Sequence, residues 1–319
     1  MENDTRNNSY DLIIIGGGPA GFSAGIYAAR KKLKTVILAQ EIGGQSVVSE
    51  GIENWIGTVK ISGEDLKKAL NAHMEAYKND AIDLHEGEKV TLLERNGAMF
   101  RATTASGNTY SARAVLIASG SSRRKLDVPG AQKFEHKGVT YCASCDGPLF
   151  SGMDVAIVGG GNAGFETAAQ LLAYVKSVTL IHRRKEFKAD PVTVEHILKH
   201  PNMRTVTNVE PISIQGDTFV KSITVRDRDS ADTQEIAVSG VFVEIGTIPN
   251  TDFVSKLVNL NTFNSIIVEP KTQRTSVEGV WAAGDCTDEL YHQNNIAVGD
   301  AVKALENLYH WIATHATTS

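Results

Sequence analysis

The sequence predicts an α/β protein built from two Rossmann-like dinucleotide-binding domains. Two stretches support this prediction, "YDLIIIGGGPAG" at residues 10–21 and "DVAIVGGGNAG" at residues 154–164. In each, an apolar strand runs into a glycine-rich turn and then a helical segment, which is the setting in which the GxGxxG pattern binds a pyrophosphate. The two stretches lie 143 residues apart in a chain of 319 residues, so they indicate an internal repeat with two nucleotide sites.

The first repeat predicts a buried strand over residues 11–15 and a helix that ends near Arg30. Between them stand Gly16, Gly18 and Gly21. The first glycine permits a tight turn, the second lets the backbone approach a pyrophosphate, and the third lets the helix pack on the strand. The phosphates then lie at the positive end of the helix.

A second strand, "KTVIL" at residues 34–38, follows this helix. Glu41 stands twenty residues after Gly21, where a carboxylate can accept hydrogen bonds from both ribose hydroxyls of an adenosine. An acidic residue at this place suits a ribose without a 2′-phosphate.

The second repeat places Gly159, Gly161 and Gly164 in the same pattern, before a helix that ends near Ala173 and a strand over residues 177–181. These glycines predict a second pyrophosphate-binding turn for the same physical reasons.

The residues that follow this strand, "HRRKEFKAD", are basic. His182, Arg183, Arg184 and Lys188 either form an ordinary solvated charge run or bind a ribose 2′-phosphate, whose geometry the arginine fork matches. Their register with the glycine pattern favours the second interpretation. We therefore expect FAD in the first site and NADPH in the second, a pairing typical of a flavoprotein reductase.

Near the carboxyl end, "GVWAAGDC" predicts a strand that stops at Gly284 and Asp285, followed by a helix within residues 291–313. Asp285 is placed to bind a ribityl hydroxyl of a flavin. An ordinary Gly-Asp turn or helix cap is the alternative.

The segment "YCASCDGPLF" at residues 141–150 holds Cys142 and Cys145, a pair that could bind zinc, form a permanent staple or cycle as a dithiol. Structural zinc needs four ligands, and a staple across so short a loop removes little chain entropy. A cycling dithiol is favoured, because the C-x-x-C arrangement lowers a thiol pKa. Asp146 either moves the proton of this cycle or only forms a turn. Cys286 is expected to be a small buried residue.

Composition excludes several other classes of protein. The net charge is -5 and no basic block is present, which argues against a nucleic-acid partner. No stretch has the length and apolar character of a signal peptide or a membrane span. No metal is expected, and the protein is expected in the cytoplasm without a membrane partner.

Seven short motifs taken together give a resemblance to a known family. They are "GGGPAG", "GGQ" at 43–45, "ENW" at 53–55, "CASCDG", "GGGNAG", "HRR" and "AAGD". With them the chain resembles the low-molecular-weight thioredoxin reductases over nearly its whole length. The resemblance implies an FAD domain of residues 1–121 and 248–319, split by an inserted NADPH domain of residues 122–247 that carries the cysteine pair. It also implies a homodimer built on the FAD domains.

The resemblance further implies which residues contact FAD: Gly16, Gly18, Gly21, Gly44, Gln45, Asn54, Asp285 and Gln293. Electrons would pass from NADPH through FAD and the Cys142–Cys145 disulfide to thioredoxin, with Cys145 nearer the flavin. Rotation of one domain about hinges near Ser121 and Ile248 would exchange NADPH and the disulfide at the flavin. Which cysteine attacks the partner is left open.

Two stretches, "GVTYCASCDGPLF" and "AAGDCTD", are more similar to the flavoprotein component of alkyl hydroperoxide reductase. That component carries an extra amino-terminal thioredoxin-like pair, whereas here the first strand begins about ten residues into the chain. A separate glutaredoxin-like or thioredoxin-like carrier of a peroxidase is therefore the alternative partner. A flavin dithiol oxidase and a redox-sensing binding module are two further hypotheses for the function. His292 and Lys188 also stand where the thioredoxin reductases usually have another basic residue.

Overall fold

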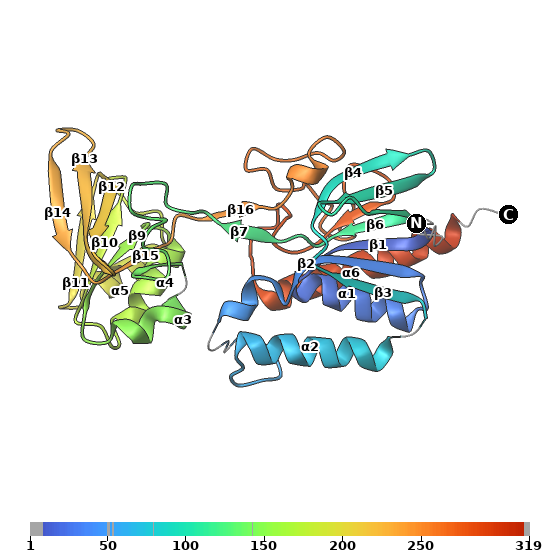
Figure 1. Ribbon diagram of the computed structural model, residues 1–319, viewed down its shortest axis with the longest axis horizontal. Coiled ribbons are helices and arrows are strands. Elements are labelled where there is room, and N and C mark those ends of the chain that lie inside the picture. The colour runs from blue at the N-terminus through green and yellow to red at the C-terminus, as the bar shows by residue number, and fades with distance from the viewer. Residues whose placement is uncertain (1–8, 50–51, 53, 79, 142, 316–319) are drawn as a thin grey trace. The chain divides into compact units, whose positions relative to one another are not determined.

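The chain divides into two α/β units (Figure 1). The computed structural model describes residues 9–49, 52, 54–78, 80–141 and 143–315. Unit 1 comprises Met1–Ser122 and Ile248–Ser319, and unit 2 comprises Arg123–Thr247. Each unit contains one of the two strand–glycine turn–helix repeats on a parallel sheet, so the predicted fold class is confirmed.

Unit 1 is built on a seven-stranded sheet with the path β3-β2-β1-β6-β5-β4, in which β17 also pairs with β6. Its elements are β1 (Ser9–Gly17), α1 (Pro19–Arg30), β2 (Thr35–Ile42), η1 (Gly44–Val48), α2 (Gly63–Tyr77), β3 (Ile82–Glu86), β4 (Val90–Asn96), β5 (Met99–Thr104), β6 (Thr109–Ile117), η3 (Asp252–Val254), β17 (Val280–Ala282) and α6 (Asn294–Thr314). Strands β1, β2, β3, β6 and β17 run parallel, and β4 and β5 form an antiparallel extension.

The apolar run of β1 is buried on both faces of this sheet, as expected for a central parallel strand. Leu12 and Ile14 point into a core with residues of α1, α2 and α6. Ile13 and Ile15 point into a second core with residues of β4, β5 and β17. The alternation follows from the two-residue repeat of a strand. The end of β1 and the start of α1 lie at the carboxyl edge of the sheet.

Unit 2 has a parallel sheet with the order β11-β10-β9-β15-β8 and a separate antiparallel sheet with the order β12-β13-β14. Its elements are β8 (Val139–Thr140), α3 (Ala143–Asp146), η2 (Gly147–Phe150), β9 (Asp154–Val158), α4 (Asn162–Leu171), β10 (Ser177–His182), α5 (Pro191–Leu198), β11 (Met203–Thr207), β12 (Val209–Gly216), β13 (Val220–Asp227), β14 (Thr233–Ala237) and β15 (Gly240–Val243). One core lies between the two sheets, and the other lies between the parallel sheet and the helices.

The chain crosses between the units at β7 (Ser121–Arg123) and β16 (Thr247–Pro249), which pair with each other. Just before these crossings, the sheet strands β6 and β15 end at Ile117 and Val243, and their apolar residues are buried within the sheets.

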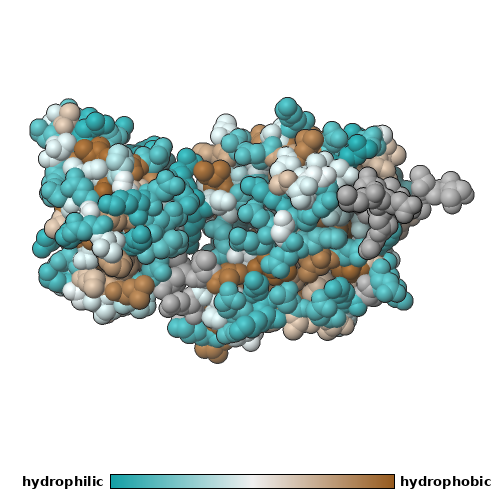
Figure 2. Space-filling model, in the orientation of Figure 1, coloured by the Kyte–Doolittle hydropathy of each residue, from teal (hydrophilic) through white to brown (hydrophobic). Residues whose placement is uncertain are grey.

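The surface in the view of Figure 2 is mostly hydrophilic on each unit, and hydrophobic residues gather in a band over α1 of unit 1. Within the described ranges, no helix has both the length and the apolar character that a membrane span requires.

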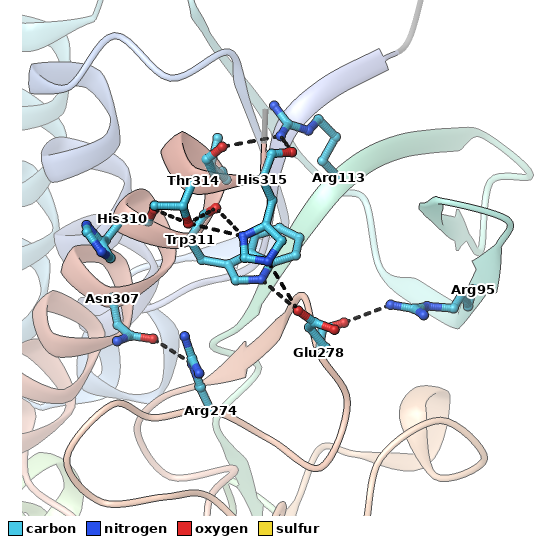
Figure 3. Close-up of polar contacts among 10 residues, drawn as sticks. Arg95, Arg113, Arg274, Glu278, Asn307, His310, Trp311, Thr314 and His315 are labelled. Carbon is cyan, nitrogen blue, oxygen red and sulfur yellow. Dashed lines mark hydrogen bonds and ion pairs between the residues drawn. The ribbon is translucent and has the colours of Figure 1, made fainter. Parts of the chain in front are cut away.

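The carboxyl end of α6 is fastened to unit 1 by a network of polar and ring contacts (Figure 3). The Trp311 indole Nε1–H donates to Glu278 Oε1 at 3.1 Å, and the His315 ring stacks on Trp311 with centroids 4.7 Å apart. Arg113 Nη2 donates to the His315 carbonyl at 2.7 Å, and Arg95 Nη2 donates to the Glu278 carbonyl at 2.9 Å. The last turn therefore has partners for its otherwise unpaired carbonyls.

Replacing Trp311 should loosen this end of α6. We expect Trp311→Ala to lower the stability of the last turns by about 2 kcal/mol, because it removes the indole hydrogen bond, the His315 stack and an edge contact with Trp281. Amide hydrogen exchange across α6 measures the change. Trp311→Phe keeps the ring contacts and should cost about 1 kcal/mol. Equal exchange rates in the alanine variant and the wild type would contradict the anchoring role.

Candidate functional site

The glycine turn of unit 1 is packed so closely that two of its glycines cannot be replaced. Gly16 has φ +127°, and a Cβ there would lie 2.1 Å from the Ala118 carbonyl oxygen. A Cβ on Gly21 would lie 2.0 Å from the Gly16 carbonyl oxygen. At Gly18 the nearest atom would be Gly44 Cα, at 3.9 Å, so packing does not explain this glycine. The open space over Gly18 matches a position where a pyrophosphate approaches the backbone.

The start of α1 presents unpaired backbone donors to this space. Gly18 is the residue before the helix, Pro19 begins it, and no side-chain cap is found among the described residues. The first N–H groups of a helix lack internal acceptors and carry partial positive charge. They can bind a phosphate without any side chain.

Residues from distant segments surround the same turn. A Cβ on Gly44 would lie 3.2 Å from Gly18 Cα, and a Cβ on Gly284 would lie 3.5 Å from the Ala20 methyl group. Glu41, exposed at the end of β2, has its carbonyl beside the turn, since a Cβ on Gly17 would lie 2.5 Å from it.

Three more of the residues predicted to bind FAD lie in two hydrogen-bonded pairs within unit 1. The Gln45 amide donates to the Ser121 carbonyl oxygen. The Asn54 amide Nδ2 donates to Gln293 Oε1 at 2.7 Å, directly before the first turn of α6. The structure therefore brings Gln45 against β7 and Asn54 against the start of α6, although these segments are far apart in sequence.

Asp285 is a partly buried carboxyl group in this cluster. Burial raises its pKa, while the positive charge of His292 and a hydrogen bond with Ser121 act in the opposite direction. Ser121 is a site residue that the sequence indicated only as a hinge. Its contacts with Gln45 and Asp285 depend on tertiary packing, which no local pattern encodes.

Cys286 follows Asp285 and is completely buried, as predicted. Its Sγ lies 3.4 Å from the Ala283 carbonyl oxygen, and burial raises the pKa of the thiol to about 11. The thiol therefore stays protonated and inaccessible at neutral pH.

The glycine turn of unit 2 repeats the geometry of the first. Gly159 has φ +129°, and a Cβ there would lie 2.0 Å from the Glu244 carbonyl oxygen. A Cβ on Gly164 would lie 1.9 Å from the Gly159 carbonyl oxygen, whereas a Cβ on Gly161 would have no atom within 4 Å. The turn lies at the carboxyl ends of β9 and β15, where the strand order of the sheet reverses and ligands bind.

The basic segment after β10 folds back onto this turn. The Lys188 backbone N–H donates to the Gly160 carbonyl oxygen at 3.1 Å. The side chains of Arg183, Arg184 and Lys188 are exposed, and no carboxylate pairs with them in the part of the chain that is described. His182 differs from them, because its ring is buried beneath the turn. The cations are thus available to an anion beside the glycine turn.

Glu244, a residue that the sequence analysis missed, lies at the end of β15 against this site. Its Oε1 accepts a hydrogen bond from the Thr167 hydroxyl at 3.0 Å and lies 3.7 Å from Arg123 Nη1. Burial raises the pKa of this carboxyl group, and Arg123 opposes the change. The signal that would have indicated it is an acidic residue at the end of the apolar strand "VFVEIG".

The cysteine segment is described in part. Cys142 lies outside the described residues, and of Cys145 only the backbone is described, within α3. The Asp146 carboxylate accepts a hydrogen bond from the buried Thr140 hydroxyl on β8. Among the described residues, no group of three or more histidine, cysteine, aspartate or glutamate side chains is placed to hold a metal ion.

A chain with two such units belongs to the class of proteins that have two dinucleotide-binding domains. The chain belongs to the pyridine nucleotide-disulphide oxidoreductase family, whose sequence profile matches residues 10–301.

The chain is similar in sequence to proteins that have two different names. The chain is 40% identical over 300 residues to the F subunit of the alkyl hydroperoxide reductase of Escherichia coli, covering 94% of this chain and 57% of that protein. It is 39% identical over 295 residues to an NADH dehydrogenase of Bacillus subtilis, covering 92% of this chain and 57% of that protein. The chain thus spans little more than half the length of these relatives.

Solved structures match over almost their full length. Thioredoxin reductase of Lactococcus lactis has a TM-score of 0.81 at 30% identity, and the match covers 96% of this chain and 99% of that one. Thioredoxin reductase of T. acidophilum has a TM-score of 0.79 at 35% identity, with the same coverage. The resemblance predicted from the seven motifs is confirmed.

Proposed function

We propose that this chain is a flavoprotein disulfide reductase that passes electrons from NADPH through FAD and the Cys142–Cys145 disulfide to thioredoxin. The observation that carries the proposal is the difference between two otherwise equal glycine turns. The turn of unit 1 is followed by Glu41, and the turn of unit 2 by a segment in which Arg183, Arg184 and Lys188 are exposed. When bound in unit 2, NADPH would supply a hydride, and FAD bound in unit 1 would supply a two-electron carrier between that hydride and a disulfide.

The residues of unit 1 fit FAD. Gly16, Gly18 and the start of α1 form a cradle that admits a pyrophosphate. A residue larger than glycine at position 18 would fill this space with its side chain. Gly44, Gln45, Asn54, Gly284 and Gln293 line the same region, and Asp285 would accept a hydrogen bond from a ribityl hydroxyl. These residues would bind and orient the cofactor, and Asp285 is itself partly buried among them.

The residues of unit 2 fit NADPH. Gly159, Gly161 and the start of α4 offer the pyrophosphate the same kind of cradle. Arg183, Arg184 and Lys188 present free cations to a 2′-phosphate, for which the arginine fork is well shaped. We therefore assign the FAD-binding domain to residues 1–121 and 248–319 and the NADPH-binding domain to residues 122–247. We also propose a homodimer.

Cys142 and Cys145 are the proposed redox pair, and Asp146 the proposed proton carrier. Reduction of a carrier disulfide forms one mixed disulfide, which the second cysteine resolves while the two carrier sulfurs each take up a proton. Asp146 follows Cys145 directly, and its carboxylate is held by the Thr140 hydroxyl. We infer from this adjacency in sequence that Asp146 exchanges that proton.

A carrier of an alkyl hydroperoxide-reducing peroxidase is the second candidate acceptor. It is supported by the 40% identity to the F subunit of that system in Escherichia coli. NADH is the corresponding second candidate donor, because the Bacillus subtilis relative is named an NADH dehydrogenase. The free cations of unit 2 favour NADPH over NADH and also argue against a dithiol oxidase without a nicotinamide site.

An anaerobic titration of the purified protein tests the proposal. NADPH should bleach the flavin absorbance at about two equivalents, because the FAD and the Cys142–Cys145 disulfide each take up one electron pair, and oxidised thioredoxin should restore it. Steady-state rates with thioredoxin and with a glutaredoxin-like carrier then identify the acceptor. If neither NADPH nor NADH bleaches the flavin, the donor assignment is wrong. If only the second carrier turns over, thioredoxin is not the acceptor.

A further inference from the structure

His182 ends β10 and is only 7% exposed, although the sequence placed it among the residues that bind the nucleotide. Both of its ring nitrogens have backbone partners. The Gly160 N–H donates to Nδ1 at 3.2 Å, and Nε2 lies 3.1 Å from the Glu186 carbonyl oxygen. An N–H can only donate and a carbonyl can only accept, so the two contacts require a neutral ring with its proton on Nε2.

The two partners belong to different parts of the nucleotide site. Gly160 is in the glycine turn, and Glu186 is in the basic segment of residues 183–188. The Lys188 N–H closes the connection by donating to the Gly160 carbonyl. Gly160 thus has both of its backbone polar groups tied, one to His182 at the end of β10 and one to Lys188 in the basic segment.

Packing holds the ring in this place. Its centroid is 5.5 Å from that of Phe187, whose ring in turn meets Phe165 of α4 edge to face at 5.0 Å. A Cβ on Gly160 would lie 2.7 Å from His182 Cγ, so the ring lies directly against bare backbone. Such a residue cannot reach a phosphate, but it can determine where the turn and the segment lie.

We propose that His182 is a positioning residue for nucleotide specificity. It fastens the segment that carries Arg183, Arg184 and Lys188 to the glycine turn, so that the cations meet the 2′-phosphate of the same molecule whose pyrophosphate lies on the turn. The inference rests on the proposed binding of NADPH by unit 2. It goes beyond that function by naming the group that couples the two halves of the site.

The charges around the ring make the link sensitive to acid. Burial lowers the pKa of His182; the bond to the Glu186 carbonyl opposes this, and the positive charges of Arg183, Arg184 and Lys188 add to the lowering. These cations all lie on the segment after β10, which also presents Phe187 to the ring, and the glycine turn presents Gly160. The folded state therefore favours the neutral ring. The link is intact above the ordinary pKa of about 6.5 and is lost as the pH falls through the lower folded value.

Two substitutions separate the two bonds of His182. Asparagine places an amide oxygen near the position of Nδ1, so His182→Asn keeps the acceptor for Gly160 and loses the donor to Glu186. Glutamine places its amide near Nε2, so His182→Gln keeps the donor and loses the acceptor. Isothermal titration with NADP⁺ and NAD⁺ measures binding without catalysis.

We expect His182→Asn to weaken NADP⁺ about tenfold, which corresponds to about 1.4 kcal/mol, and NAD⁺ by less than about twofold, because only the basic segment is released. We expect His182→Gln to weaken both nucleotides about tenfold, because the turn itself is released. Arg183→Ala, a direct phosphate reader, should weaken NADP⁺ alone. Retained circular dichroism and melting temperature distinguish these losses from misfolding.

The ring itself gives an independent measurement. The nitrogen chemical shifts of His182 in the wild-type protein should show the tautomer protonated on Nε2 at pH 7. Binding of NAD⁺, which has no 2′-phosphate to titrate, should weaken in the wild type as the pH falls through the lowered pKa of His182, and should not weaken in His182→Asn. Wild-type affinities for both nucleotides in both variants would overturn the positioning role. If the wild type binds neither nucleotide, the proposed function itself fails.

Discussion

Cys142→Ser and Cys145→Ser should each lower the rate of NADPH-dependent thioredoxin reduction by more than about a thousandfold. A single cysteine cannot form the internal disulfide, and a mixed disulfide with the carrier then has no partner thiol to resolve it. Reduction of the flavin by NADPH should persist in both variants, because the nucleotide sites do not depend on these sulfurs. Stopped-flow absorbance separates flavin bleaching from turnover with thioredoxin.

The same two variants identify the attacking cysteine, which the sequence leaves open. The variant that retains the attacking thiol should accumulate a stable mixed disulfide with oxidised thioredoxin, visible by mass spectrometry. Cys286→Ala is the matched control, because its thiol is completely buried and has a raised pKa. It should leave the turnover rate within about twofold of the wild type. Turnover above a tenth of the wild-type rate in Cys142→Ser would contradict the relay.

The fold and the glycine turns could be predicted because their signals are local. A strand, a glycine turn and a helix follow one another within about twenty residues, and the continuous apolar run of β1 is visible in its letters. The sequence indicated only part of the physical reason why each of these positions must be glycine. The obstacles at Gly16 and Gly159 are the carbonyls of Ala118 and Glu244, which reach these turns from strands far away in sequence.

His182 shows why the remainder could not be predicted. In sequence it belongs to a run of cations, and its register with the glycine pattern suggested a phosphate ligand. Its burial depends on how the chain turns back after β10, which places Glu186 and Gly160 on opposite sides of the ring. The same holds for Ser121, whose neighbours Gln45 and Asp285 come from segments that only the fold brings together.

Gly159→Ala should destabilise unit 2 by more than about 3 kcal/mol and abolish NADP⁺ binding. The residue has φ +129°, which a side chain makes costly, and the new methyl group would lie 2.0 Å from the Glu244 carbonyl oxygen. Backbone on both sides must move to relieve this contact, and the turn that receives the pyrophosphate moves with it. Hydrogen exchange in β9 and α4 and calorimetric titration with NADP⁺ measure the two effects.

Gly161→Ala is the control that separates stability from binding. Its φ of -99° is ordinary, and the methyl group would have no protein atom within 4 Å. We expect the stability of unit 2 to change by less than about 0.5 kcal/mol, while NADP⁺ binding weakens at least about tenfold, because the methyl group occupies the space that the pyrophosphate needs. FAD content should be unchanged in both variants, since unit 1 has its own cores. Wild-type affinity for NADP⁺ in Gly161→Ala would show that the pyrophosphate does not lie over this turn, and the assignment of the nucleotide to unit 2 would then need a different site.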